Sequence, residues 1–272
     1  MRGLLLGLAC AMLVPLLGCD NGTAANDDAA LFAPANRPVA SSPAERDSAL
    51  ALLDRMQRSA FDSAFVHLDR YGFVRSMRTE QRTASGAVTA WTERTLRYPA
   101  DGTAPRVLNS DSMGAFTGTT LGPLGPSSAP KPQPPNAATY AFPEDAAYLS
   151  ERTQGAFQYT LRPNTSIDGQ AARVVEIHPK QTPDGRDQVI RFARLTIARG
   201  THQLLAAHTV RSERVLLFQE DSELILRLQR SPDRQTWVPA VSRFRTRVDV
   251  PLRDPQQFRT ASTYTDYVRP RS

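Results

Sequence analysis

The chain has 272 residues, a formal net charge of +6 at pH 7 and only two cysteines. So few cysteines exclude the cysteine-rich zinc and iron–sulfur sites. The positive charge comes almost wholly from arginines scattered among acidic residues, without the basic cluster and interleaved aromatic residues of a nucleic-acid interface. We therefore expect no nucleic-acid partner, and at most a mild attraction to anionic lipid headgroups.

The N-terminal segment has the three parts of a bacterial lipoprotein signal. A basic Arg2 precedes an apolar run, and Leu16-Leu17-Gly18-Cys19 closes that run in the form of a lipobox. The run is shorter than the roughly 20 residues that cross a bilayer, which favours cleavage over a transmembrane anchor. We predict a signal peptide over residues 1–18 and a covalent diacylglycerol and acyl lipid on Cys19, with no other cofactor.

A tether and one larger domain are expected after the cleavage site. Residues 19–41 are small, polar and proline-containing, which predicts a disordered tether with a root-mean-square span of about 25 Å. Cys10 leaves with the signal peptide, so no disulfide can form in the mature chain. The domain over residues 42–272 must therefore be stabilised by a packed core.

That domain is expected to begin with a helix. Ser42-Pro43-Ala44-Glu45 has the form of a capping box with proline at the first helical position. Leu50, Leu53 and Met56 then follow at helical spacing, as an apolar stripe does.

The remainder is typical of strands joined by short turns, which favours antiparallel neighbours. Glycines and prolines gather over about 114–143, which predicts an exposed loop. Another turn is expected at Glu220-Asp221-Ser222. The expected strands cover residues 73–82, 88–98, 106–109, 157–162, 172–178, 188–198, 203–211, 214–219, 224–230, 237–250 and 258–268.

Alternation in the last strands predicts a sheet that is apolar on one face and rich in arginine on the other. One face would carry Val238, Ala240, Phe244, Val248 and Val250, and the other Arg243, Arg245 and Arg247. Leu224, Leu226 and Leu228 alternate with Glu223, Ile225, Arg227 and Gln229 in the same way. The expected fold is mainly β with an N-terminal helix: a curved antiparallel sheet forming a half-open barrel around helices.

Three segments resemble the outer-membrane lipoprotein-sorting group, which includes a periplasmic lipoprotein carrier and its lipid-anchored receptor. They are RLTIARGTHQLL at 194–205, TWVP at 236–239 and TYTDY at 263–267. Ala198 and Arg199 stand where that pattern commonly has an aspartate. The resemblance implies a half-open barrel with a helical lid and an apolar cavity for acyl chains. Leu224, Leu226, Leu228, Val238, Phe244 and Val248 would then line this cavity.

Other chemistry is less favoured by the residues. No nucleophile elbow, HExxH, P-loop or GxGxxG motif occurs, so no catalytic residues are predicted. His202 and His208, with Asp266, could form a metal site. We favour the structural explanation, in which His202 lies in a turn and His208 in a half-buried strand. Glu220, Asp221 and Glu223 are better explained by a solvated turn than by paired-carboxylate catalysis. A row of arginines could contact lipid phosphates, but a solvated outer face on which they pair with Glu and Asp is favoured. The row consists of Arg243, Arg245, Arg247 and Arg259.

The expected function is that of a lipid-anchored protein of the bacterial cell envelope, facing the periplasm or the cell surface. It would bind acyl chains of a lipid or lipoprotein for transport or sorting, without catalysis and without a metal. The alternative is a structural envelope lipoprotein whose sheet presents a surface to a protein partner. The residues leave the ligand, the membrane and the oligomeric state open.

Overall fold

A computed structural model of the chain describes residues 41–116, 146–180, 190–215, 218–249 and 254–269. All of them belong to one compact unit, Asn36–Ser272. The predicted signal peptide, Cys19, nearly all of the tether, most of the Pro-rich loop and Val250 lie outside the described residues. Within the described ranges no helix combines the length and the apolar character needed to cross a membrane.

The helical segment begins as its capping residues predict. In α2 (Pro43–Asp54) the backbone N–H of Glu45 donates to Oγ of Ser42 at 3.2 Å. The Glu45 carboxylate makes a different contact from the one a capping box implies, since it accepts from the backbone N–H of Leu161 at 3.1 Å. Two short pieces follow, α3 (Ser59–Ser63) and the 3-10 helix η1 (Val66–Arg70), and a further 3-10 turn, η2 (Gln154–Ala156), precedes the fourth strand.

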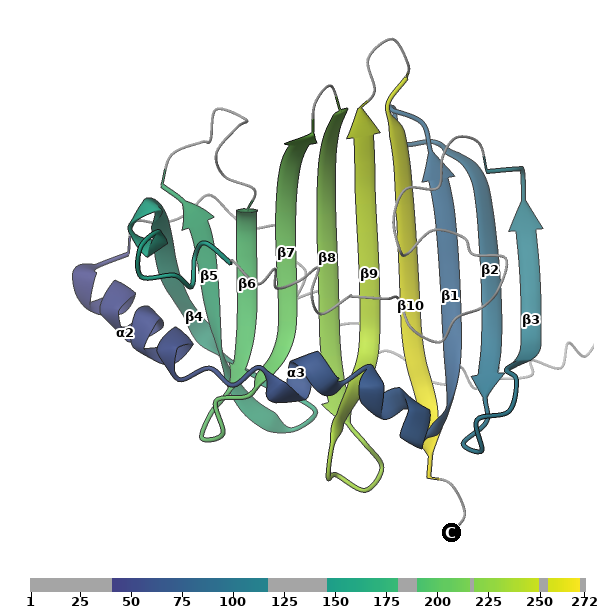
Figure 1. The fold of residues 1–272 in the computed structure, drawn as a ribbon, viewed down its shortest axis with the longest axis horizontal. Helices are drawn as coiled ribbons and strands as arrows, with labels where there is room; N and C mark the ends of the chain where they lie inside the picture. Colours follow the sequence, from purple (N-terminus) through teal and green to yellow (C-terminus); the bar gives the residue numbers. More distant parts are fainter. Residues whose placement is uncertain (1–40, 117–145, 181–189, 216–217, 250–253, 270–272) are drawn as a thin grey trace, which may run out of the picture. The chain divides into compact units, whose positions relative to one another are not determined.

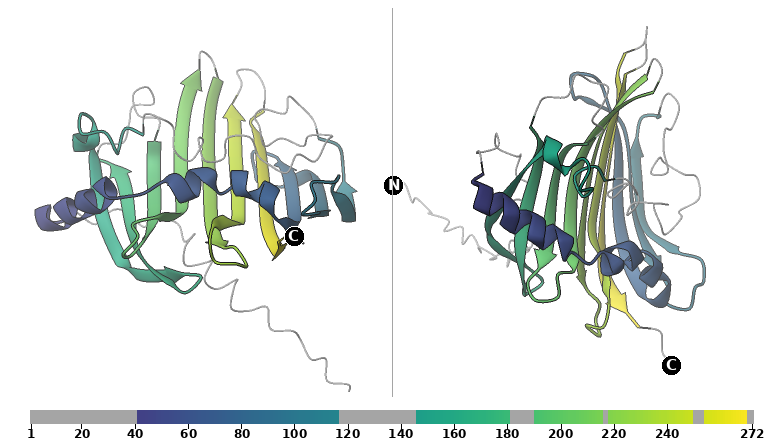
Figure 2. Two further views of the ribbon diagram at one scale, coloured as in Figure 1. Left: turned by 60° about the horizontal axis from the view of Figure 1, so that its bottom comes forward. Right: turned by 60° about the vertical axis from the view of Figure 1, so that its left-hand side comes forward.

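Ten strands form a single antiparallel sheet in the order β3-β2-β1-β10-β9-β8-β7-β6-β5-β4 (Figure 1). The expected fold class is confirmed, and the sheet is open and curved (Figure 2). The first three strands join the rest through β1 and β10, which lie at opposite ends of the chain. The strands are β1 (Gly72–Arg82), β2 (Val88–Tyr98), β3 (Arg106–Met113), β4 (Phe157–Ile167), β5 (Gln170–Pro179), β6 (Ile190–Ala198), β7 (Leu204–Val215), β8 (Phe218–Arg230), β9 (Trp237–Asp249) and β10 (Gln256–Val268).

The helices cover one face of the sheet, which we call the inner face; the opposite one is the outer face. α2 packs against β4, α3 against β7 and η1 against β9, so the helical segment crosses the sheet near one end of its strands (Figure 1). Phe61 and Leu68 of this segment are buried against the sheet. The inner face therefore holds the main apolar core.

One predicted turn is wrong. Glu220, Asp221 and Ser222 lie inside β8, which pairs without interruption with β7 from Val215 opposite Phe218 onward. The strand expected over residues 214–219 is accordingly divided between the ends of β7 and β8. The turn prediction fails because β7 and β8 stay paired through these polar residues, although their composition alone favours a turn.

Candidate functional site

The inner face over β4 to β8 is an apolar surface closed by the helical segment. Leu224, Leu226 and Leu228 of β8 all belong to the main core cluster, and each is at most 1% exposed. The same cluster includes Phe61 of α3, Phe65 directly before η1, and Leu68 of η1. The predicted alternation of β8 is confirmed, because its leucines occupy the core and Glu223 lies on the other face in an ion pair with Arg245.

Strand register places only some of the six predicted cavity residues in the main core cluster. Phe244 lies directly opposite Leu224 and joins the same core cluster. Val248 is on the same face of β9, two positions beyond Thr246, and is buried outside that cluster. Four of the six, Leu224, Leu226, Leu228 and Phe244, are thus brought together, and their contact with a ligand stays a prediction.

The prediction that Val238 and Phe244 share a face is wrong. A β-bulge in β9 sets Arg227 opposite Val241 but Leu228 opposite Pro239, which inserts one extra residue on the β9 side. An extra residue reverses the alternation beyond it. Val238 therefore pairs with Gln229 on the outer face, while Trp237 points to the inner face and packs in the core.

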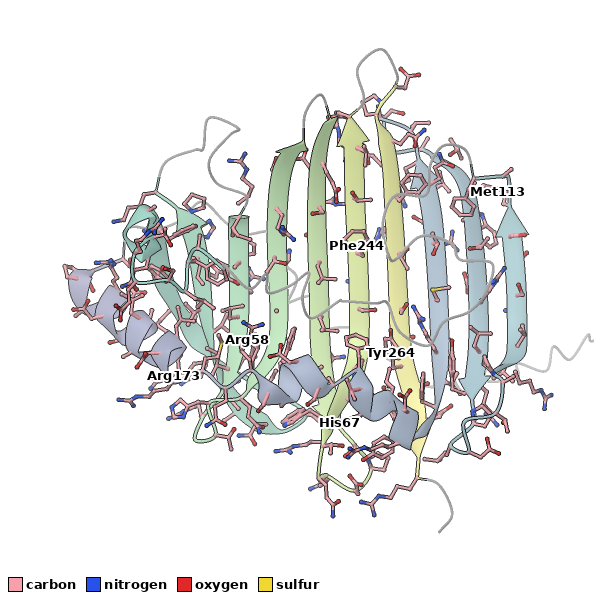
Figure 3. The ribbon with its side chains drawn as sticks, in the orientation of Figure 1. Arg58, His67, Met113, Arg173, Phe244 and Tyr264 are labelled. Atoms are coloured by element: carbon pink, nitrogen blue, oxygen red, sulfur yellow. The ribbon has the colours of Figure 1, made fainter. Side chains whose placement is uncertain are left out.

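Over β1 and β10 the inner face mixes the core aromatics Phe73 and Tyr264 with polar side chains, and the sequence reasoning missed these polar groups. Arg75 of β1 is only 6% exposed. Its guanidinium donates to Oγ of Ser262 at 3.1 Å and lies 5.5 Å from the centre of the Tyr264 ring (Figure 3 labels this tyrosine). The sequence could have indicated this burial, because side chains alternate along a strand. Arg75 and Arg78 are three residues apart, so they must point to opposite faces.

Hydroxyl groups continue this polar half. Thr79 and Thr260 are direct partners across β1 and β10, with their hydroxyl oxygens 3.2 Å apart. One strand further, Thr260 is opposite Phe244 and Ser262 is opposite Ser242, so hydroxyl and apolar side chains adjoin on this face. An amphiphilic ligand on this face would meet alkyl side chains at one side and hydrogen-bonding groups at the other.

Two buried tyrosines stay neutral beside the apolar half. Burial raises the pKa of Tyr148 and of Tyr159 well above the usual value of a phenol. The hydroxyl of Tyr159 donates to the carbonyl oxygen of Tyr148 at 2.6 Å, which ties the segment before η2 to the sheet. These tyrosines act as structural groups, since neither can supply a phenolate near neutral pH.

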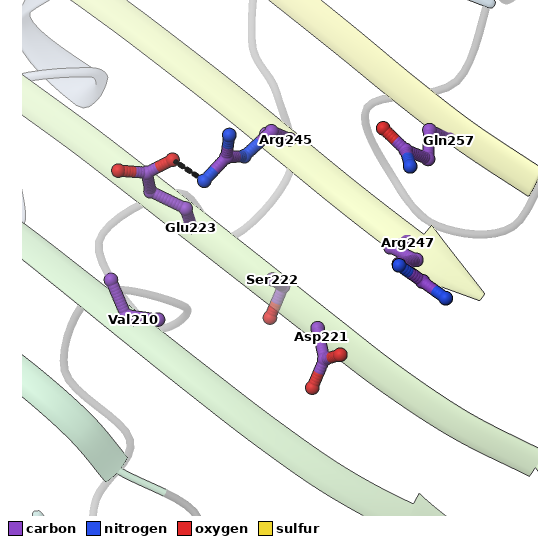
Figure 4. A pocket seen from close by; sticks show the side chains of 7 residues that line it. All are labelled: Val210, Asp221, Ser222, Glu223, Arg245, Arg247 and Gln257. Atoms are coloured by element: carbon purple, nitrogen blue, oxygen red, sulfur yellow. Dashed lines mark ion pairs between the residues drawn. The ribbon is translucent and has the colours of Figure 1, made fainter. Parts of the chain in front are cut away.

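The outer face carries a shallow charged pocket of about 250 Å³ on β7 to β10 (Figure 4). Its Glu223 accepts from Nε2 of His208 and pairs with Arg245, each at 2.8 Å. The hydrogen bond from His208, with the charge of Arg245, holds the pKa of the Glu223 carboxyl below its usual value despite burial. The arginine row is thus paired with acids here, as expected of an outer face.

The three residues considered for a metal site lie in different elements, with Asp266 in β10. His202 lies in the turn between β6 and β7, whereas His208 lies within β7 and bonds to Glu223. Among the residues that the structure describes, no group of three or more His, Cys, Asp or Glu side chains could hold a metal ion.

Comparison with known proteins gives structural likenesses only. No protein-family model and no curated protein matches the chain. A DUF1329 family protein from Desulfovibrio piger is 12% identical, covering 83% of this chain and 93% of its own, at a TM-score of 0.26. A LolA superfamily protein from Nitrosomonas europaea is 12% identical, covering 86% and 95%, at a TM-score of 0.23.

A putative outer membrane lipoprotein-sorting protein domain from Vibrio parahaemolyticus is also similar. It is 11% identical, covers 82% of this chain and 93% of its own, and has a TM-score of 0.26. Two of the three descriptions name the group that the sequence segments resemble. Scores this low carry no conclusion about function, and the curved open sheet rests on the strand pairing described above.

Proposed function

We propose that this chain is an exported lipoprotein, anchored through Cys19, that binds an acyl chain of a lipid or lipoprotein on the inner face of its sheet. It would hold the chain for transport or sorting and perform no catalysis. One observation carries the proposal: the apolar half of the inner face is covered by α3 and η1, two pieces of five residues each. Helices this short have no stability of their own, so they form a cover that can be displaced.

The free energies of burial are consistent with a ligand replacing this cover. Burying Phe61, Phe65 and Leu68 contributes about 2 kcal/mol each, or about 6 kcal/mol together. An alkyl chain that buries ten methylene groups gains about 8 kcal/mol. A ligand could therefore replace these three side chains at little net cost, provided that the segment moves.

Acyl binding can be tested on the Cys19→Ala full chain, because this substitution removes any covalent lipid. Mass spectrometry of the intact protein under native conditions should detect a co-purified acyl species. Phe65→Ala should raise the affinity for a fluorescent long-chain fatty acid, because it removes part of the cover. Phe244→Arg should lower that affinity by about tenfold or more, because it places a charge on the apolar face.

Thr263→Arg is the matched control for Phe244→Arg. Thr263 is exposed on the neighbouring strand, and it pairs with Val241 on the outer face. The control should bind the fatty acid as the parent does, and melting curves should show that both variants fold. If the parent chain carries no acyl species and shows no saturable fatty-acid binding, the proposal fails.

A second candidate function is favoured by the close packing of the same cluster. Leu226 and Leu228 are fully buried in this closed form. A filled interior suits an envelope lipoprotein that presents its sheet to a protein partner. Absence of acyl binding, together with a defined complex on cross-linking in cells, would favour this candidate.

A further inference from the structure

A second pocket lies at the end of the sheet where α2 stops. It has a volume of about 230 Å³ between the end of α2, β5 and the turn that joins β6 to β7. Three arginines and one histidine line it, together with apolar groups and Gly200, and no acidic residue contributes. The lining residues are Leu52, Arg55, Arg173, Ile197, Ala198, Arg199, Gly200 and His202.

Register explains why these cations meet. Arg173 of β5 pairs with Ile197 of β6, whose side chain belongs to the inner-face core. Arg173 therefore points to the inner face, at the end of the strand beside α2 (Figure 3). Arg199 follows Ile197 by two residues, and Arg55 is the C-cap residue directly after α2. Three separate segments thus bring one guanidinium each to a single pocket.

The charges of this pocket are not neutralised within the part of the chain that the structure describes. The guanidinium groups of Arg55, Arg173 and Arg199 make no ion pair or hydrogen bond with another described residue. The outer-face pocket is different, because there Arg245 pairs with Glu223 at 2.8 Å and Arg247 with Asp249 at 3.0 Å. An anion would compete with carboxylates at the outer pocket but would meet uncommitted donors at this one.

The frame of the pocket is held by backbone hydrogen bonds. The N–H of Gln57 donates to the carbonyl of His202 at 2.8 Å, and the carbonyl of Gln57 accepts from Leu204 at 2.9 Å. The N–H of Arg199 donates to the carbonyl of Ala171 at 2.8 Å. These bonds tie the residues after α2, and the start of β5, to the β6–β7 turn, so the backbone segments that carry the three arginines are held together.

The charge balance favours an anion. The carboxyl end of a helix carries a partial charge of only about −0.5, which three guanidinium groups outweigh. Arginine binds phosphate in a planar, bidentate manner, and the histidine ring adds a further N–H donor. We propose that this arginine pocket, formed by Arg55, Arg173, Arg199 and His202, binds a phosphate monoester or diester group. This proposal goes beyond the proposed acyl binding and does not depend on it.

Two sources can supply this chemistry: the headgroup of an anionic phospholipid, or a soluble phosphate or phosphoester. The test uses the Cys19→Ala full chain, so that no lipid anchor contributes. Calorimetry measures binding of inorganic phosphate. Co-sedimentation measures binding to vesicles of phosphatidylglycerol and phosphatidylcholine, and to vesicles of phosphatidylcholine alone.

The pocket variant is Arg55→Gln, Arg173→Gln and Arg199→Gln. The control is Arg97→Gln, Arg106→Gln and Arg234→Gln, which removes the same charge from exposed positions elsewhere on the domain. Loss of three charge-assisted contacts should weaken binding of the true ligand by at least about tenfold in the pocket variant. The control should retain binding within about twofold, since only diffuse attraction is lost.

Each outcome is decisive. Loss of binding to phosphatidylglycerol vesicles in the pocket variant alone identifies a headgroup site. Loss of phosphate binding in that variant alone, with vesicle binding equal in both variants, identifies a site for a soluble phosphate or phosphoester. Equal losses in both variants would mean diffuse charge and overturn the proposal, as would the parent binding neither probe. Fatty-acid binding is read separately, so failure here leaves the acyl proposal standing.

Discussion

The two edge strands of the sheet, β4 and β3, differ in how they are covered, although both pair antiparallel with their neighbours. At the β4 edge, α2 packs over the strand and Glu45 accepts from the outward N–H of Leu161. Pro163, further along β4, has no N–H to offer. At the β3 edge all eight residues are exposed. The covered β4 edge resists pairing with a further strand, whereas the exposed β3 edge is available for such pairing.

The difference extends to charge. Across β2 and β3, Arg97 is opposite Arg106 and Glu93 is opposite Asp111, two pairs of like charge. Across β4 to β6, Glu176 lies between Arg162 and Arg194, at 2.5 and 2.7 Å. Like charges directly opposite destabilise a strand pair, whereas separating the three strands of the buried triad would break ion pairs that balance one another's charge. The β3 side should therefore open first.

The largest effect is expected in the covered core. Leu226→Ala should lower the free energy of unfolding by about 4 kcal/mol, because it leaves a cavity among fully buried neighbours. Leu108→Ala in β3, where the leucine is 42% exposed, should change it by less than about 0.5 kcal/mol. Urea unfolding measures both. Similar losses in the two variants would contradict the contrast between core and edge.

Removing the charge of Glu176 comes next. Glu176→Gln should cost about 3 kcal/mol at neutral pH, because the guanidinium of Arg194 is left buried without its partner carboxylate. Glu93→Gln is the matched control on the open side, where both partners of the Arg78–Glu93 pair are more than 40% exposed. It should cost less than about 0.5 kcal/mol.

The loss in Glu176→Gln should depend on pH. Burial raises the pKa of the Glu176 carboxyl, but hydrogen bonds from Arg162 and the charge of Arg194 outweigh burial, so the pKa lies below 4.5. A pKa lowered by folding stabilises the native state above the pKa of the unfolded chain, and this contribution is lost as the pH falls through the folded pKa. The difference between parent and variant should be constant above about pH 6 and shrink below pH 4.5. A difference that grows on acidification would contradict the assigned ion pairs.

A smaller effect is expected at the capped β4 edge. Glu45→Ala should cost about 1 kcal/mol, since the N–H of Leu161 loses its acceptor within the protein. Glu45→Gln keeps an acceptor oxygen and should cost less. Hydrogen exchange gives a direct reading, because the Leu161 amide should exchange faster in the alanine variant. Unchanged exchange at this amide would mean that Glu45 does not cap the edge.

The smallest change should be stabilising. Asp111→Arg turns the like-charge pair with Glu93 into an opposite-charge pair, worth about 0.5 kcal/mol at low salt. The gain should fade at high salt, because both groups are exposed and screened. Thermal melts at two salt concentrations measure it. A loss of stability at low salt would show that the register of β2 and β3 differs from the one described.

Local structure could largely be predicted from particular residues. Ser42 and Pro43 predicted the start of α2, and Gly86, with a φ of +89°, lies in the short connection between the strands expected over 73–82 and 88–98. The leucines of β8 were assigned to the correct face. Two local expectations failed for one reason: Glu220-Asp221-Ser222 was predicted as a turn and β9 as unbroken, whereas cross-strand register decides both.

The sequence by itself determined the strands, most of their faces and the capped helix, because these follow from spacing between near neighbours. Only the tertiary structure decided which strands are neighbours, that a bulge moves Val238 to the outer face, and that Arg75 is buried on the inner one. It also brought Arg55, Arg173 and Arg199 from three distant segments into one pocket. Such contacts depend on register and loop closure across the whole chain, and no local pattern encodes them.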